Sequence, residues 1–134
     1  MLASALLQIA DCLHERFGLD ALWLFGSEAR GTATSESDLD VAALFRRRPL
    51  RAELLEARLD LADLLARDVD LVDLDNASPI LVMQVLSNGR LLVENDPVHR
   101  RRLVEAAPGR YEDLKIVRRE AARSLLERVP GGRS

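Results

Sequence analysis

The chain has 134 residues, of which 48% are hydrophobic and 31% are charged, and its formal net charge at pH 7 is −3. These values fit one globular domain with a hydrophobic core, and they exclude a disordered acidic chain and a strongly basic nucleic-acid-binding protein. We therefore expect a single domain over residues 1–134, with a core at about 18–95 and a C-terminal helical region at about 97–129.

The charges are distributed unevenly along the chain. Residues 97–134 hold ten Arg and Lys against five Asp and Glu, so their net charge is +5, whereas residues 1–96 carry −8. A basic tail of this kind is either a solvated amphipathic helix or a surface for a partner, and the sequence allows both interpretations.

The cysteine content bears on the compartment. Cys12 is the one cysteine of the chain and cannot form an internal disulfide, so a reducing compartment, the cytoplasm, is expected. The apolar start has no basic leader, which argues against a signal peptide. No stretch is apolar enough to cross a membrane, so we expect no membrane contact.

Helices are predicted where apolar residues recur at spacings of three and four, with Gly, Ser and Pro marking the ends. The Pro108-Gly109 pair is expected to break or kink the last helix, which resumes at about residue 110. The expected buried face of the second helix is Leu50, Leu54, Ala57, Leu61, Leu64 and Leu65. The predicted helices are residues 2–17, a segment that begins at Pro49 or Leu50, residues 79–88 and a C-terminal region from Pro97.

Strands are predicted at residues 22–25, 38–45, 69–74 and 90–94. The first two are separated by too few residues for a helical crossover, whereas helices lie between the later ones. We therefore expect an α/β (α+β) fold in which a small mixed β-sheet is packed with helices.

The segment from Leu24 to Val41 combines two chemical features. Asp38 and Asp40 are two positions apart on a predicted strand, so they point to the same face. Two adjacent carboxylates repel unless a cation lies between them, and Mg²⁺ prefers oxygen ligands and accompanies substrate phosphates. Upstream, Gly26-Ser27 suits a tight turn whose backbone N–H groups bind an anion. This one segment therefore predicts a metal-ligand pair beside a phosphate site.

Three other features each have a structural and a functional interpretation. Trp23 is expected to pack in the core, and stacking on a nucleobase is the alternative. The triplet Arg46–Arg48 is expected to be solvated, and a contact with phosphate or with an acidic partner is the alternative. His14 and His99 lie far apart in the sequence, so surface or capping roles are expected rather than metal binding.

The order Gly26-Ser27, ten further residues and Asp38-Leu39-Asp40 resembles the pattern of the nucleotidyltransferase superfamily that includes DNA polymerase β. The similarity continues through Val69–Leu74, Val85–Leu92 and Tyr111–Lys115, and so covers roughly residues 20–120. In this form the chain is similar to the minimal nucleotidyltransferases (MNT), specifically the MntA-type antitoxins that are paired with HEPN-domain toxins. The resemblance implies a polymerase-β-like nucleotidyltransferase fold.

The resemblance also implies roles for individual residues. Gly26 and Ser27 hold the triphosphate of ATP, and Arg30 is a further candidate for a phosphate contact. Asp38 and Asp40 hold two Mg²⁺ ions.

A third carboxylate completes the implied site. The resemblance places it at Asp70, which binds the second metal ion and helps to deprotonate the attacking hydroxyl. Neighbouring carboxylates leave alternatives for this position, namely Asp68, Asp73 and Asp75.

The function implied by the resemblance is that of a type VII antitoxin. Such a protein is an Mg²⁺-dependent protein adenylyltransferase that transfers AMP from ATP to a tyrosine of its cognate HEPN-domain RNase toxin. It forms a hetero-oligomer with the toxin and needs no direct contact with nucleic acid. One alternative is neutralisation by a stable complex without catalysis. Another is a small-molecule nucleotidyltransferase of the aminoglycoside-modifying kind, although 134 residues leave little room for the extra substrate domain of those enzymes.

Overall fold

The computed structural model of the chain describes residues 2–26, 31 and 38–128. Its strands are β1 (Leu19–Phe25), β2 (Leu39–Phe45), β3 (Val69–Asp73) and β4 (Arg90–Glu94). Its helices are α1 (Leu2–Phe17), α3 (Arg51–Leu65), α4 (Pro79–Asn88), α5 (Pro97–Arg128) and the short 3-10 turn η1 (Leu74–Asn76).

Within these residues the strands form one four-stranded sheet in the order β3-β2-β1-β4. β1 is antiparallel to both of its neighbours, whereas β3 is parallel to β2. A parallel pair needs a crossover connection, and α3 provides it between β2 and β3. The predicted mixed sheet with packed helices is therefore confirmed, although β1 begins at Leu19 rather than at residue 22.

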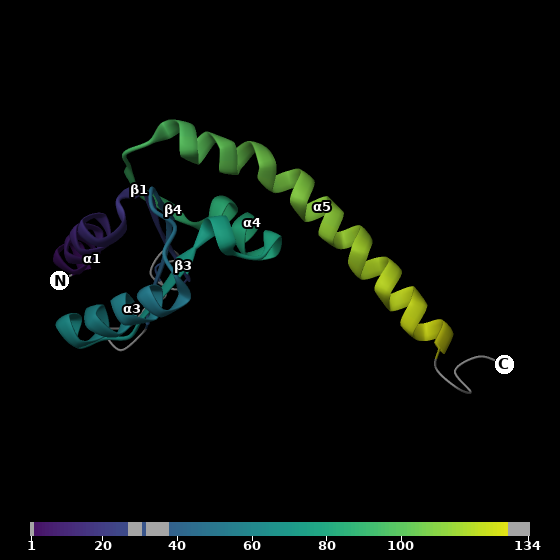
Figure 1. Cartoon of the computed structure of the whole chain (residues 1–134), viewed down its shortest axis with the longest axis horizontal. Coiled ribbons are helices and arrows are strands. Elements are labelled where there is room, and N and C mark those ends of the chain that lie inside the picture. The colour runs from purple at the N-terminus through teal and green to yellow at the C-terminus, as the bar shows by residue number, and fades with distance from the viewer. Residues whose placement is uncertain (1, 27–30, 32–37, 129–134) are drawn as a thin grey trace.

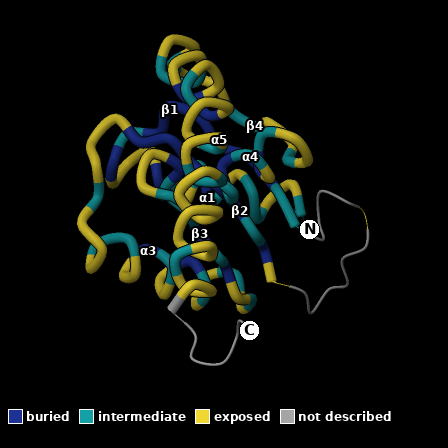
Figure 2. The backbone as a smooth tube through the Cα atoms, turned by 90° about the vertical axis from the view of Figure 1, so that its right-hand side faces the viewer, coloured by how far each residue is buried: buried dark blue, intermediate teal, exposed yellow. Residues whose placement is uncertain are grey.

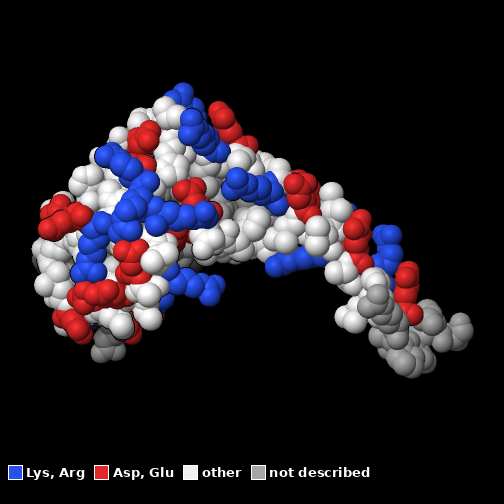
Figure 3. Space-filling view, viewed as in Figure 1, with Lys and Arg blue, Asp and Glu red and all other residues white. Residues whose placement is uncertain are grey.

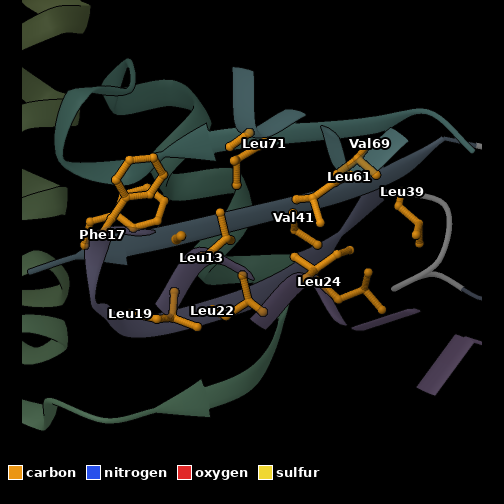
Figure 4. Close-up of a cluster of buried hydrophobic side chains, with 14 residues drawn as sticks. Leu13, Phe17, Leu19, Leu22, Leu24, Leu39, Val41, Leu61, Val69 and Leu71 are labelled. Carbon is orange, nitrogen blue, oxygen red and sulfur yellow. The ribbon is translucent and has the colours of Figure 1, made fainter. Parts of the chain in front are cut away.

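Helices cover both faces of this sheet (Figure 1): α1 and α3 pack on one face, and α4 and the first part of α5 pack on the other. Alternation along β1 produces the two clusters, because Leu22 and Leu24 point to the first face while Ala21 and Trp23 point to the second. Figure 4 shows the first cluster, in which leucines from β1 and β2 meet side chains of α1 and α3. Trp23 is only 4% exposed and packs in the core, as predicted.

Helix α3 begins after Leu50, whose N–H donates to the Glu53 carboxylate at 3.0 Å. Two leucines that were expected on its buried face are exposed: Leu50 precedes the helix, and Leu64 lies at the border of the apolar stripe. The residues that pack toward the sheet are Leu54, Ala57, Leu61 and Leu65. This orientation leaves the opposite side of α3 in contact with solvent.

The predicted break at Pro108 is wrong, because α5 continues through it to Arg128. A proline inside a helix leaves the carbonyl of the residue four positions earlier, here Val104, without its usual donor. Val104, Pro108 and Gly109 are all exposed, so water can satisfy that carbonyl at little cost. Figure 2 shows that most of α5 is exposed, and Figure 3 shows that acidic and basic side chains alternate along its outer part. In the described ranges, no helix combines the length and the apolar character that a membrane span requires.

The arginine triplet after β2 makes contacts within the chain. Arg47 forms two hydrogen bonds with the Glu53 carboxylate, at 3.1 and 3.0 Å, and lies over the Phe17 ring. Arg48 donates to the Asp75 carbonyl at 3.5 Å, and Arg46 lies 3.7 Å from a carboxylate oxygen of Asp20. The triplet therefore ties the end of β2 to α1, α3 and η1, and is more than a solvated loop.

A histidine joins three elements at the end of the sheet where β1 begins. His99 of α5 contacts Asp20 of β1 through Nδ1 and Asp75 of η1 through Nε2, each at 2.7 Å. Asp20 is only 3% exposed, so its carboxylate needs such a partner. Burial alone would lower the pKa of His99, but its hydrogen bonds to Asp20 and Asp75 outweigh that effect and raise the pKa. The protonated imidazole thus fixes the start of α5 to the sheet.

Replacing His99 by glutamine is expected to lower the free energy of unfolding by about 2 kcal/mol, because the buried Asp20 carboxylate loses its hydrogen-bonded partner at 2.7 Å and retains Arg46 at 3.7 Å. The folded-state pKa of His99 lies above the ordinary value of 6.5, so this stabilisation is complete below that value and is lost as pH rises through the raised pKa. Urea unfolding of both proteins from pH 5.5 to 8.5 measures the difference. A gap that stays constant over this range would contradict the assignment.

Candidate active site

The end of β1 lies directly against a carboxylate of β2. Gly26 follows β1 with φ +71°, a left-handed conformation that L side chains rarely adopt. A Cβ atom placed on Gly26 would lie 2.9 Å from Cγ of Asp40 and would overlap one of its carboxylate oxygens. Glycine is therefore required here for two reasons: the backbone is left-handed, and a side chain would overlap Asp40. Ser27 and Arg30, the other predicted phosphate contacts, lie outside the described residues.

Two of the predicted carboxylates come from neighbouring strands. Asp40 of β2 and Asp70 of β3 are direct partners in the parallel register, so their side chains emerge side by side on one face of the sheet. Asp38 is exposed and stands just before β2 begins, two positions from Asp40. The sheet thus brings the three predicted acidic positions to one end, where like charges favour a bound cation.

Arg58 is a component of this site that the sequence did not indicate. Its guanidinium lies 3.4 Å from a carboxylate oxygen of Asp70, and its Nε donates to the Val69 carbonyl at 3.3 Å. Because β3 stands at one end of the strand order, Arg58 reaches it from α3 along the open edge of the sheet. Both partners are more than a third exposed, so water weakens this ion pair and a metal or substrate can replace it.

Two hollows lie on either side of the carboxylates. On the β1 side, a hollow of about 310 Å³ is lined by Phe25, Gly26 and the side chains of Gln84 and Asn88 from α4. On the β3 side, a hollow of about 360 Å³ lies between α3 and β3 and contains Asp38, Arg58, Asp68 and Asp70. Gln84 and Asn88 were not singled out in the sequence, although their four-residue spacing on a largely apolar helix could have indicated a common polar face.

The carboxylates at this end of the sheet are possible ligands for a metal ion. Among the described residues, no three His, Cys, Asp or Glu side chains are gathered closely enough to hold a metal ion by themselves. Mg²⁺ is commonly bound by one or two carboxylates together with substrate phosphates, and Asp40 and Asp70 offer that pair of oxygen donors. The residues therefore fit Mg²⁺ that arrives with a nucleotide better than a metal ion held by the protein alone.

A family match covers the part of the chain that contains these residues. Residues 8–98 match the family described as Polymerase beta, Nucleotidyltransferase. The chain belongs to this nucleotidyltransferase family. The matched residues include the end of β1, both hollows and the three acidic positions, so the family relationship covers the whole of the candidate site.

Individual relatives carry a more specific name than the family does. The protein adenylyltransferase MntA of Shewanella oneidensis is 42% identical over 80 residues, which are 55% of this chain and 53% of the relative. The match thus spans about half the length of that relative.

Solved structures are similar over a larger part of the chain. A chain from a toxin-antitoxin crystal structure with AMP-PNP superposes with a TM-score of 0.75 at 30% identity and covers 89% of this nucleotidyltransferase and 96% of that chain. A chain from the complex of tri-AMPylated Shewanella oneidensis HEPN toxin with MNT antitoxin gives 0.75 at 26% identity, with 94% and 99% covered. The fold is therefore shared with these chains over most of the sequence.

Proposed function

We propose that this nucleotidyltransferase is an antitoxin of the MntA type that transfers AMP from ATP to a tyrosine of a cognate HEPN-domain toxin. The observation that carries the proposal is the close approach of Gly26 to Asp40, with Asp70 in register beside it, within a chain that belongs to the nucleotidyltransferase family. The similarity to chains crystallised with AMP-PNP and with a tri-AMPylated toxin supports AMP as the transferred group.

The proposed reaction is the transfer of an adenylyl group to a hydroxyl. The acceptor hydroxyl oxygen attacks the α-phosphorus of ATP and forms a new P–O bond, while the bond from that phosphorus to the α,β-bridging oxygen breaks and pyrophosphate leaves. The hydroxyl proton passes to a base, for which Asp70 is our candidate. Gly26 and Ser27 are proposed to bind the triphosphate, and Arg30 is proposed as a further phosphate contact.

Asp38, Asp40 and Asp70, together with the phosphates of the nucleotide, would hold two Mg²⁺ ions. When bound, these ions neutralise the charge that develops on the attacking and leaving oxygens. The chain itself contributes orientation: the parallel register fixes Asp40 against Asp70, and Gly26 keeps the space beside Asp40 open. Most of the rate enhancement is then positional and electrostatic.

AMP on the toxin has a direct physical effect. An adenylyl group adds bulk and a negatively charged phosphodiester at a surface that must accept RNA phosphates. Like charges repel, so the modified RNase would lose affinity for its substrate.

The proposal is tested by incubating the protein with α-labelled ATP, Mg²⁺ and the cognate HEPN-domain protein. Label is expected on a tyrosine of the partner, together with loss of its RNase activity. Neutralisation by a stable complex is the second candidate, because similar chains were crystallised as toxin-antitoxin complexes. Suppression of the RNase without any label transfer would favour this second candidate.

We further propose that the protein is located in the cytoplasm and that residues 1–134 act as a single domain. Cys12 is half-buried among α1 and its neighbours, and burial is the main cause that raises the pKa of its thiol. A thiol of raised pKa is a poor nucleophile and suits a structural role in a reducing compartment.

A further inference from the structure

We infer that the hollow between α3 and β3, here called the acceptor groove, binds the segment of the protein partner that carries the reacting hydroxyl. This inference rests on the proposed adenylyl transfer and assigns its second substrate to a place in the fold. The groove has a volume of about 360 Å³, and its walls are Leu55, Leu59 and Ala62 on α3 opposite Asp38, Asp68 and Asp70.

The apolar wall of the acceptor groove is a regular feature of α3. Leu55, Leu59 and Ala62 are spaced by four and three residues, so they lie on one side of the helix. Leu55 is 53% exposed and Leu59 is 58% exposed. Single exposed leucines are ordinary, but two on the same side of a helix that line a hollow with carboxylates indicate a contact surface.

The position of the groove satisfies the geometry of the reaction. Phosphoryl transfer requires the attacking and leaving oxygens to lie roughly in line on opposite sides of the phosphorus. Across the sheet, Gly26 follows β1, Asp40 is on β2 and Asp70 is on β3. With the triphosphate at the β1 side, an acceptor held in the groove would approach Asp70 past the open β3 edge, where Arg58 contacts it.

The chemistry of the groove defines the occupant. Three carboxylates and one guanidinium, that of Arg58, leave the polar end acidic. Asp68 is exposed in the groove and has no place in the metal-binding set that we propose. We therefore expect a segment that places an apolar side chain on Leu55 and Leu59, a hydroxyl near Asp70 and a basic side chain near Asp68. A surface that also binds RNA phosphates supplies basic side chains of this kind.

The test uses the full chain, the cognate HEPN-domain protein, ATP and Mg²⁺. The double variant Leu55→Ala/Leu59→Ala removes the apolar wall, and Leu50→Ala/Leu64→Ala removes two leucines of similar exposure that do not line the groove. The groove variant is expected to raise the KM for the HEPN protein roughly tenfold while kcat and the KM for ATP stay near the wild-type values. The control variant is expected to change none of these constants.

Binding without nucleotide supplies a second readout. Titration calorimetry of the HEPN protein is expected to give a Kd that is also raised roughly tenfold in the groove variant. Asp68→Asn is expected to raise the Kd by a smaller factor and to weaken its dependence on salt.

The outcomes separate this inference from the proposed function. If the wild type binds the HEPN protein but transfers no AMP, the proposed activity fails and the Kd values alone decide on the groove. Equal Kd and KM values in the groove variant and the control would contradict the inference that the partner segment binds in the acceptor groove. Absence of any binding by the wild type would overturn it as well.

Discussion

Replacing Asp40 by asparagine is expected to lower the rate of AMP transfer by about a thousandfold, on the order of 4 kcal/mol of transition-state stabilisation. The amide keeps the size of the side chain but removes the charge that faces Asp70 across the parallel register. The site would then lose its affinity for the cation that accompanies the triphosphate. Transfer of labelled AMP to the HEPN protein, measured against Mg²⁺ concentration, gives the rate and the metal requirement together.

A matched control is available on α5. Asp113→Asn removes one exposed carboxylate far along that helix and is expected to leave the rate unchanged. The Asp40 variant should also retain its melting temperature, because removing one of several like charges at this end of the sheet relieves repulsion. Transfer at more than a tenth of the wild-type rate would show that Asp40 is not a metal ligand.

Replacing Gly26 by alanine is expected to reduce AMP transfer about a hundredfold and to destabilise the fold by about 1–2 kcal/mol. The added methyl group would occupy the space of the Asp40 carboxylate, which must move away from Asp70. The left-handed backbone at φ +71° adds its own strain. The initial rate of transfer and the midpoint of urea unfolding measure the two effects separately.

Gly31 provides the comparison that separates them. It has almost the same conformation, φ +74°, but a Cβ atom there meets nothing within 4 Å. Gly31→Ala is therefore expected to share the cost of the backbone strain without moving a carboxylate. If both alanine variants lost activity equally, strain in the segment would explain the loss and the contact with Asp40 would not.

Local sequence patterns were sufficient to predict which strands carry the carboxylates of the site. The alternation along 38–45 and 69–74 placed Asp40 and Asp70 on strands, and the parallel register puts them side by side. Of the alternatives for the third position, Asp73 accepts a hydrogen bond from the Asp75 N–H and Asp68 lies before β3. Asp70 therefore remains our choice on geometric grounds.

Contacts between distant segments could not be predicted in the same way. Arg58 reaches Asp70 from another element, and His99 joins Asp20 to Asp75 across 79 and 24 positions of sequence. Periodicity does not report which polar side chains meet after folding. The predicted break at Pro108 is absent for a related reason, since a proline on a solvated side of a helix costs less than one in a packed helix.

The length of α5 has a consequence for the motion of the molecule. Its 32 residues extend about 48 Å at 1.5 Å per residue, and from Ile116 to Glu127 every side chain except Ser124 is exposed. Isolated helices shorter than about 12–15 residues are marginal in water without tertiary support, and the exposed outer segment is of about that length. The outer turns should therefore exchange their amide hydrogens far faster than the turns near Leu103, and a partner that binds them would slow this exchange.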